Sequence, residues 1–168
     1  GLNLRAGRKA LVSSAYDAAF SYFGSGMELL PERSWQRLYS LTFDLYINAS
    51  QAAYLCRDFK AAEHLAKVLM GEAKTDLEKA RIHRMRLLQY AVLGKLEEAA
   101  EEGLMGLTLL GIFMPAKPHS LHVTKENLVT RWNLGRRPID QLINLPEMTD
   151  ESKRMAIRIL MELAPAAY

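Results

Sequence analysis

Cysteine, charge of one sign and long apolar runs are all scarce in this chain. Among 168 residues there is one cysteine, Cys56, so no disulfide can close within the chain, which favours a reducing, cytoplasmic location. Lys and Arg number 22 against 19 Asp and Glu, and the formal net charge is only +3. Because no stretch gathers charge of one sign, we expect no nucleic acid partner.

The apolar runs are too short for a membrane helix. The longest, over 107–116, is interrupted by Thr108 and falls far short of the roughly 20 residues that a membrane helix needs. No signal peptide is expected either, because the chain is amphipathic from its start. Ten Gly and six Pro are too few for a collagen-like chain. Hydrophobic residues make up 49% of the chain, which is too many for a disordered protein. The length suits one domain, or one array of small repeats.

Apolar residues recur at the spacing of α-helices along the whole chain, and strand-like alternation is absent. Ser34 and Asp58 are predicted helix caps, and Thr75 followed by Glu78 has the spacing of a capping box. The pattern predicts an all-α fold with helices near 2–13, 16–29, 35–56, 59–71, 75–94, 96–110, 124–134, 138–144, and from 149 or 150 to 163.

Small residues recur behind large ones at a repeating interval. Ala19, Ala62 and Ala99 lie 43 and 37 residues apart. The large residues three positions before these alanines are Tyr16, Phe59 and Leu96. The equivalent positions on the preceding helices are Gly7, Ser50 and Leu87. Because small side chains let two helices approach closely, the pattern predicts three helical hairpins.

The pattern resembles the tetratricopeptide repeat. The first repeat matches it at Gly7, Tyr16, Ala19, Phe23, Gly26 and Pro31. The other two depart from it, lack the terminal proline, and exceed the usual length of about 34 residues. The resemblance implies a divergent α-solenoid of three hairpins over 1–110, a Pro-containing loop over 111–123, and C-terminal helices over 124–168 that pack on or extend the array. An ordinary helical bundle with alanine-rich seams is the alternative.

Three stretches resemble a helical region of very large signalling proteins: LRAGRKALVSSAYDAAFSYFGSGMELLP, AAYLCRDFKAAEHL and LINLPEMTDESKRMAIRIL. Those proteins carry a serine/threonine-kinase-like head, a predictive STAND-type ATPase, this helical region, a GAF domain and a histidine kinase. The resemblance implies a non-catalytic protein–protein or interdomain scaffold that couples the ATPase to the sensor-kinase modules.

Motifs for catalysis or cofactor binding are missing. Neither GxxxxGK[ST] nor GxGxxG occurs. His119 and His122 lie three apart without further metal ligands nearby, and are predicted to be exposed loop residues. The acidic cluster of Glu97, Glu98, Glu101 and Glu102 is predicted to be a solvated helix face. We therefore expect no enzyme activity, no metal and no cofactor in this chain.

A second hypothesis is a ligand-sensing repeat domain that binds a peptide or a small anionic molecule. The first helices of the hairpins line the concave face of such an array. Arg81 and Arg84 lie one turn apart and could meet one carboxylate or phosphate, while Asn48 and Gln51 could hold an extended peptide backbone. Alternatively, Arg81, Arg84 and Arg86 solvate the helix or pair with Glu78 and neighbouring acids.

The expected partners are other proteins or adjacent domains, with homo-oligomers forming through exposed repeat ends. Apolar residues gather at both ends of the chain: Leu2, Leu4 and Leu11 near the start, and Ile157, Leu160, Met161 and Leu163 near the end. Burial in the core is the competing interpretation for both groups.

Overall fold

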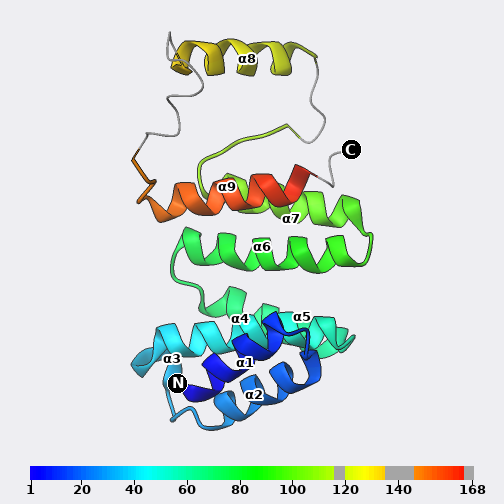
Figure 1. Cartoon of the computed structure of the whole chain (residues 1–168). Helices are drawn as coiled ribbons and strands as arrows, with labels where there is room; N and C mark the ends of the chain where they lie inside the picture. The colour runs from blue at the N-terminus through cyan, green and yellow to red at the C-terminus, as the bar shows by residue number, and fades with distance from the viewer. Residues whose placement is uncertain (116–119, 135–145, 165–168) are drawn as a thin grey trace.

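The computed structural model describes residues 1–115, 120–134 and 146–164, and within these ranges the chain contains helices and no strand (Figure 1). The predicted all-helical class is thus confirmed. The helices in the described ranges are α1 Leu2–Val12, α2 Tyr16–Glu28, α3 Ser34–Arg37, α4 Tyr39–Leu55, α5 Phe59–Glu72, α6 Asp76–Val92, α7 Leu96–Leu109, α8 Ser120–Leu134 and α9 Glu151–Leu163.

The helices pack as successive hairpins. α1 pairs with α2, α4 with α5, and α6 with α7, and neighbouring hairpins meet where α2 contacts α4 and where α4 and α5 contact α6. α9 lies across α6 and α7 at the upper end of this stack (Figure 1). α8 is drawn apart from the stack, and its side chains over 124–130 are exposed.

Small residues lie where helices cross most closely. Ala19, Ala62 and Ala99 are buried, which confirms the prediction that the recurring alanines lie in the packing interfaces. A methyl group at Gly7 of α1 would stand 2.4 Å from the ring of Phe23 on α2, so only glycine fits there. The recurring alanines and Gly7 are therefore contact points within the hairpins, whereas the recurring large residues Phe59 and Leu96 are exposed.

The three hairpin turns share one backbone geometry. Ser14, Arg57 and Gly94 have φ of 57°, 65° and 70°. In each turn the next residue donates its N–H to a carbonyl five positions back: Ala15 to Ala10 at 2.9 Å, Asp58 to Ala53 at 2.9 Å, and Lys95 to Tyr90 at 3.0 Å. These turns follow the same 43- and 37-residue spacing as Ala19, Ala62 and Ala99.

The left-handed turn residues give a stability prediction. Ser14→Gly and Arg57→Gly should each raise the free energy of unfolding by about 0.5–1 kcal/mol, because glycine adopts positive φ without strain. Gly94→Ala should lower it by about 1 kcal/mol, although the site has open space for a methyl group. Urea unfolding measures all three, with Gly24→Ala inside α2 as the control. A destabilising Arg57→Gly would contradict the prediction.

Two of the predicted helix starts are confirmed. Asp58 accepts the N–H of Ala61 at 3.0 Å at the start of α5. At the start of α6, Glu78 donates its N–H to Thr75 Oγ1 at 3.2 Å, and Glu78 Oε2 accepts the Thr75 N–H at 3.0 Å. This reciprocal pair is the predicted capping box.

The predicted helix over 35–56 is wrong, because the chain breaks at Leu38, whose φ is −133°. Ser34 is the first residue of α3, not its cap; Arg33, with φ of 57°, precedes it. Across the break, the centroid of the Trp35 ring lies 5.0 Å from that of the Tyr46 ring. Further on, α8 begins at Ser120, within the predicted loop over 111–123. The predicted helix over 138–144 lies outside the described residues.

The predicted apolar ends are partly buried. At the N-terminus Leu4 is buried and Leu2 is exposed. Along α9 the buried face contains Met155, Ala156, Ile159 and Leu163, whereas Ile157 and Met161 are exposed. Burial in the core thus accounts for part of each group, and docking of the exposed residues stays a prediction.

Candidate functional site

The four predicted groove residues gather around one pocket of about 200 Å³. Asn48 and Gln51 come from α4, and Arg81 and Arg84 come from the facing helix α6. Arg8, from α1, joins them. The remaining residues that line this pocket are Ile47, Met85, Leu88, Met155 and Arg158. The four residues that helical spacing put on the facing sides of these helices thus lie on one common surface.

Most of these polar groups are already bonded within the chain. Asp44 of α4 accepts from Arg81 at 3.0 Å through Oδ1 and from Arg8 at 2.9 Å through Oδ2. The Asn48 amide donates to the backbone carbonyl of Asp44 at 2.6 Å. Arg84 donates through Nε to Glu162 Oε1 at 3.1 Å. Arg81 and Arg84 therefore bind two separate carboxylates.

Glu78, the partner suggested for these arginines, is held elsewhere. Its Oε2 accepts the Tyr39 hydroxyl at 2.9 Å and the Lys74 N–H at 2.8 Å. Burial opposes its charge, but these hydrogen bonds outweigh burial and lower the pKa of Glu78. Burial, together with Glu78, raises the pKa of Tyr39 to about 12. The Tyr39 hydroxyl therefore stays protonated and donates.

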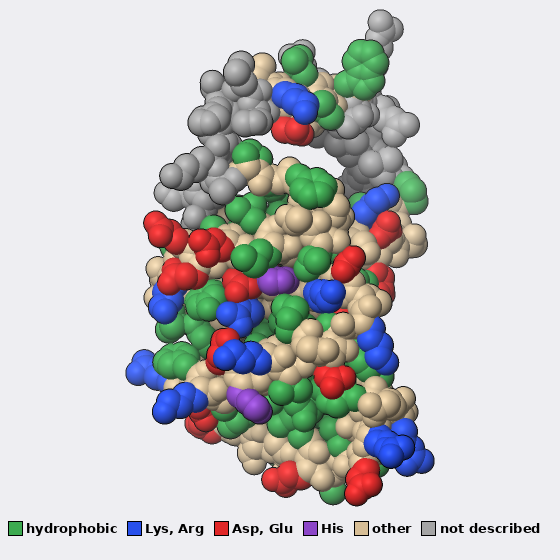
Figure 2. All heavy atoms as spheres, turned by 180° about the vertical axis from the view of Figure 1, so that it is seen from behind, with side chains coloured by type: hydrophobic (Ala, Val, Ile, Leu, Met, Phe, Trp, Pro, Cys, Tyr) green, Lys and Arg blue, Asp and Glu red, His purple; other side chains and the backbone are tan. Residues whose placement is uncertain are grey.

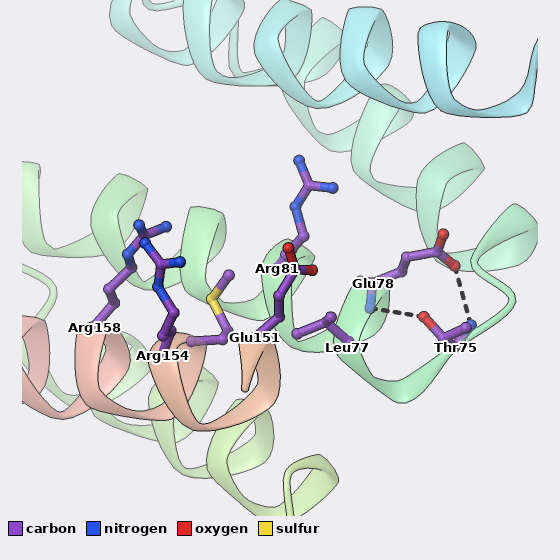
Figure 3. A pocket seen from close by; sticks show the side chains of 8 residues that line it. Thr75, Leu77, Glu78, Arg81, Glu151, Arg154 and Arg158 are labelled. Carbon is purple, nitrogen blue, oxygen red and sulfur yellow. Dashed lines mark hydrogen bonds between the residues drawn. The ribbon is translucent and has the colours of Figure 1, made fainter. Parts of the chain in front are cut away.

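A second pocket of about 440 Å³ adjoins the first. It shares Arg81, Met155 and Arg158 with the first pocket. Its other lining residues are Thr75, Leu77, Glu78, Glu151 and Arg154, and Figure 3 shows them between the start of α6 and the start of α9. We call the two pockets together the arginine groove, after Arg8, Arg81, Arg84, Arg154 and Arg158.

Arg154 and Arg158 were missed in the sequence analysis. They lie one turn apart on α9 and are exposed, and within the described ranges neither guanidinium group has a hydrogen bond or an ion pair. Figure 3 shows their guanidinium groups pointing the same way, with the Arg81 side chain extending from α6 to one side of them. Their spacing was visible in the sequence, but their place beside Arg81 depends on how α9 docks on α6.

The acidic cluster on α7 is not uniformly solvated. Glu97, Glu98 and Glu101 are exposed, as predicted, but only 13% of the Glu102 side chain is exposed. Glu102 Oε2 lies 2.7 Å from His83 Nδ1. No local sequence pattern predicts this contact between α6 and α7. The prediction of a solvated face is therefore wrong for Glu102, because α7 packs it against α6.

Arg86 completes this ion-pair cluster. Its Nε donates to Glu102 Oε1 at 2.6 Å, and its terminal nitrogens donate to Glu63 at 3.1 Å and to the Tyr90 hydroxyl at 3.1 Å. Burial opposes the charge of Glu102, but the bonds from His83 and Arg86 outweigh it and lower its pKa. Figure 2 shows acidic and basic side chains interspersed around histidine on one face of the molecule, without a large patch of one sign.

Reactive groups are few in the described part of the chain. Burial, followed by the hydrogen bond to Asp17, raises the pKa of the Cys56 thiol, so it carries little thiolate character. No group of three or more His, Cys, Asp or Glu in the described ranges could hold a metal ion. His119 and the side chain of His122 lie outside the described residues.

The described helices include none with the length and apolar character needed to cross a membrane.

Comparison with known proteins places this chain beside a signalling protein. No family model matches the chain, and no solved structure matches it. The chain is similar to hybrid signal transduction histidine kinase G from Dictyostelium discoideum, at 24% identity over 152 residues. The match covers 85% of this chain but 4% of that relative. The chain thus resembles a short part of a much longer signal-transduction protein.

Proposed function

We propose that this chain is a non-catalytic scaffold that couples an ATPase module to sensor-kinase modules within a signal-transduction protein. Its similarity to a short part of a histidine kinase supports a role inside a long chain. A scaffold acts by contacting its neighbours differently in two states, so the way its own hairpins meet is decisive.

The common geometry of the turns at Ser14, Arg57 and Gly94 is the observation that carries this proposal. Equal turns direct each second helix back along its first in the same way, as a tetratricopeptide-like array requires and an irregular bundle does not. α9 adds support. Gly26 of α2 faces Leu45 on the next first helix, and Gly106, at the equivalent position of α7, faces Ile159 of α9.

Polar contacts between α4 or α5 and α6 form a seam through the middle of the stack. We define the seam by the pairs Asp44–Arg81, Glu63–Arg86, Tyr39–Glu78 and Ser50–Gln89. An apolar cluster of Phe43, Leu69 and Ile82 lies beside them. Hydrogen bonds and ion pairs can exchange one partner for another. Such a seam therefore suits movement of one group of hairpins against the other.

The proposal is tested in the full-length protein. Asp44→Asn with Glu63→Gln removes two seam carboxylates while keeping their shapes. We expect nucleotide control of histidine autophosphorylation to weaken by roughly fivefold or more, as for loss of a coupling energy of about 1 kcal/mol. Nucleotide hydrolysis itself should stay unchanged. Glu28→Gln with Glu97→Gln, two exposed carboxylates outside the seam, is the matched control.

Two results would overturn the scaffold proposal. One is a complete coding sequence with neither an ATPase nor a histidine-kinase module beside residues 1–168. The other is a seam variant whose autophosphorylation responds to nucleotide as strongly as the wild type.

As a second proposal, the arginine groove senses a peptide or a small anionic molecule. The gathering of Asn48, Gln51, Arg81 and Arg84 around one pocket favours it. Arg81→Ala with Arg84→Ala should abolish binding of such a ligand to this pocket, whereas unchanged binding would exclude the pocket as its site.

A further inference from the structure

We infer that the arginine groove binds a phosphate group, carried by a small molecule or by a phosphorylated side chain, between Arg81 of α6 and Arg154 and Arg158 of α9. This inference rests on the second proposal and specifies its ligand chemistry. It also adds two arginines that the sequence did not point to.

The two α9 arginines lack the carboxylate partners that the other groove arginines have. Arg154 and Arg158 are one turn apart, and like charges at that spacing repel each other along a helix. No ion pair within the described residues offsets this repulsion. An anion between the two guanidinium groups would offset it, and planar guanidinium forks suit bidentate binding of phosphate oxygens.

The groove keeps a net positive charge that suits an anion. Asp44 is shared by Arg8 and Arg81, so this trio keeps one positive charge. Arg154 and Arg158, with Glu151 as the acidic residue beside them, keep another. A phosphate monoester carries about −1.5 to −2 at neutral pH, whereas a single carboxylate carries one negative charge. Ionised Glu78 cancels one of these two charges, so the groove keeps a net positive charge, and phosphate is favoured over a carboxylate by its three acceptor oxygens, which can meet several guanidinium groups at once.

The remaining acids of the groove are already bonded. The Glu78 carboxylate faces Thr75 (Figure 3). It also accepts the Tyr39 hydroxyl, and the Lys74 ammonium lies 4.0 Å from the centre of the Tyr39 ring. The Glu162 carboxylate pairs with Arg84. Neither acid competes for Arg154 or Arg158.

The size of the groove points to a phosphate attached to something larger. The pocket of about 440 Å³ lies within the range of roughly 300–1,000 Å³ typical of small-molecule sites. Leu77 and Met155 provide apolar surface beside the arginines. Because the phosphate would touch both α6 and α9, its binding would hold α9 more firmly on the stack.

The test is calorimetric titration of the 168-residue chain at constant ionic strength. The probes are inorganic phosphate, a short phosphoserine peptide, and the same peptide with glutamate in place of phosphoserine. Arg154→Gln with Arg158→Gln should weaken binding of both phosphate probes about tenfold or more. Arg5→Gln with Lys153→Gln removes the same charge outside the groove and should leave binding unchanged. Circular dichroism checks that both variants fold.

The probes also separate the two sources of phosphate. Equal affinity for inorganic phosphate and phosphopeptide supports a small phosphate compound, and much tighter phosphopeptide binding supports a phosphorylated segment. Equal affinity for the glutamate peptide would overturn the phosphate inference and leave the anion-sensing proposal intact. No binding of any probe, or equal losses in the two variants, would overturn the site. None of these outcomes bears on nucleotide control of autophosphorylation, which tests the scaffold proposal separately.

Discussion

Replacing Phe23 with alanine should lower the free energy of unfolding by about 3–5 kcal/mol, the usual cost of emptying a large aromatic site in a core. Phe23 is fully buried on α2, in a cluster with Leu4, Ala19 and Leu45 that joins the first two hairpins. Its ring lies directly against Gly7 of α1. Urea unfolding followed by circular dichroism measures the loss.

The same contact makes the effect of Gly7→Ala depend on residue 23. In the wild-type chain the new methyl group meets the buried Phe23 ring, so Gly7→Ala should cost about 1–3 kcal/mol despite its better helix propensity. In the Phe23→Ala background the methyl group enters the vacated space and should cost nothing or stabilise.

Gly24→Ala is the matched control for this cycle, because nothing lies within 4 Å of its added methyl group. It should be neutral or stabilise by up to about 1 kcal/mol. Equal effects of Gly7→Ala in both backgrounds would contradict the close contact between α1 and α2.

Glu102→Gln should destabilise the fold by about 2–3 kcal/mol, because an amide cannot accept from both His83 and Arg86 and leaves Arg86 short of a charged partner. Glu97→Gln, an exposed change on the same helix, is the control and should shift stability by less than about 0.5 kcal/mol. Denaturant unfolding at pH 7 compares the two variants.

The pH dependence of stability offers an independent measurement of Glu102. Its folded-state pKa lies below the unfolded value of about 4.3, so ionised Glu102 stabilises the fold fully above that value. This contribution is lost as the pH falls through the folded-state pKa. Glu102→Gln should therefore lose less stability than the wild type on acidification below about pH 4.3. If both proteins lost the same free energy of unfolding below about pH 4.3, this assignment would be contradicted.

Local patterns predicted most of the helices, because caps and apolar spacing act over a few residues. The Thr75–Glu78 box and the Asp58 cap are examples, and the three recurring alanines identified the packed positions. The break at Leu38 was not predictable in this way. The break accompanies a tertiary contact, the tilted packing of the Trp35 ring on that of Tyr46, and no local signal in the sequence marks it.

Only the part of the arginine groove formed by α4 and α6 was predictable from the sequence. Helix phase placed Asn48 and Gln51 on one face of α4 and Arg81 and Arg84 on one face of α6. The acids that pair with these arginines depend on the register between helices, which brings Asp44 to Arg81 and Glu162 to Arg84. Similarly, α9 reaches α6 only after the long connection that follows α7.

The shared turn geometry also bears on how the length of such a chain can vary during evolution. Each turn at Ser14, Arg57 and Gly94 sends its second helix back along its first in the same direction. Duplicating or deleting a whole hairpin would therefore preserve the way in which each second helix runs back along its first. An insertion of one or two residues within a helix would instead rotate every contact surface beyond it by about 100° per residue.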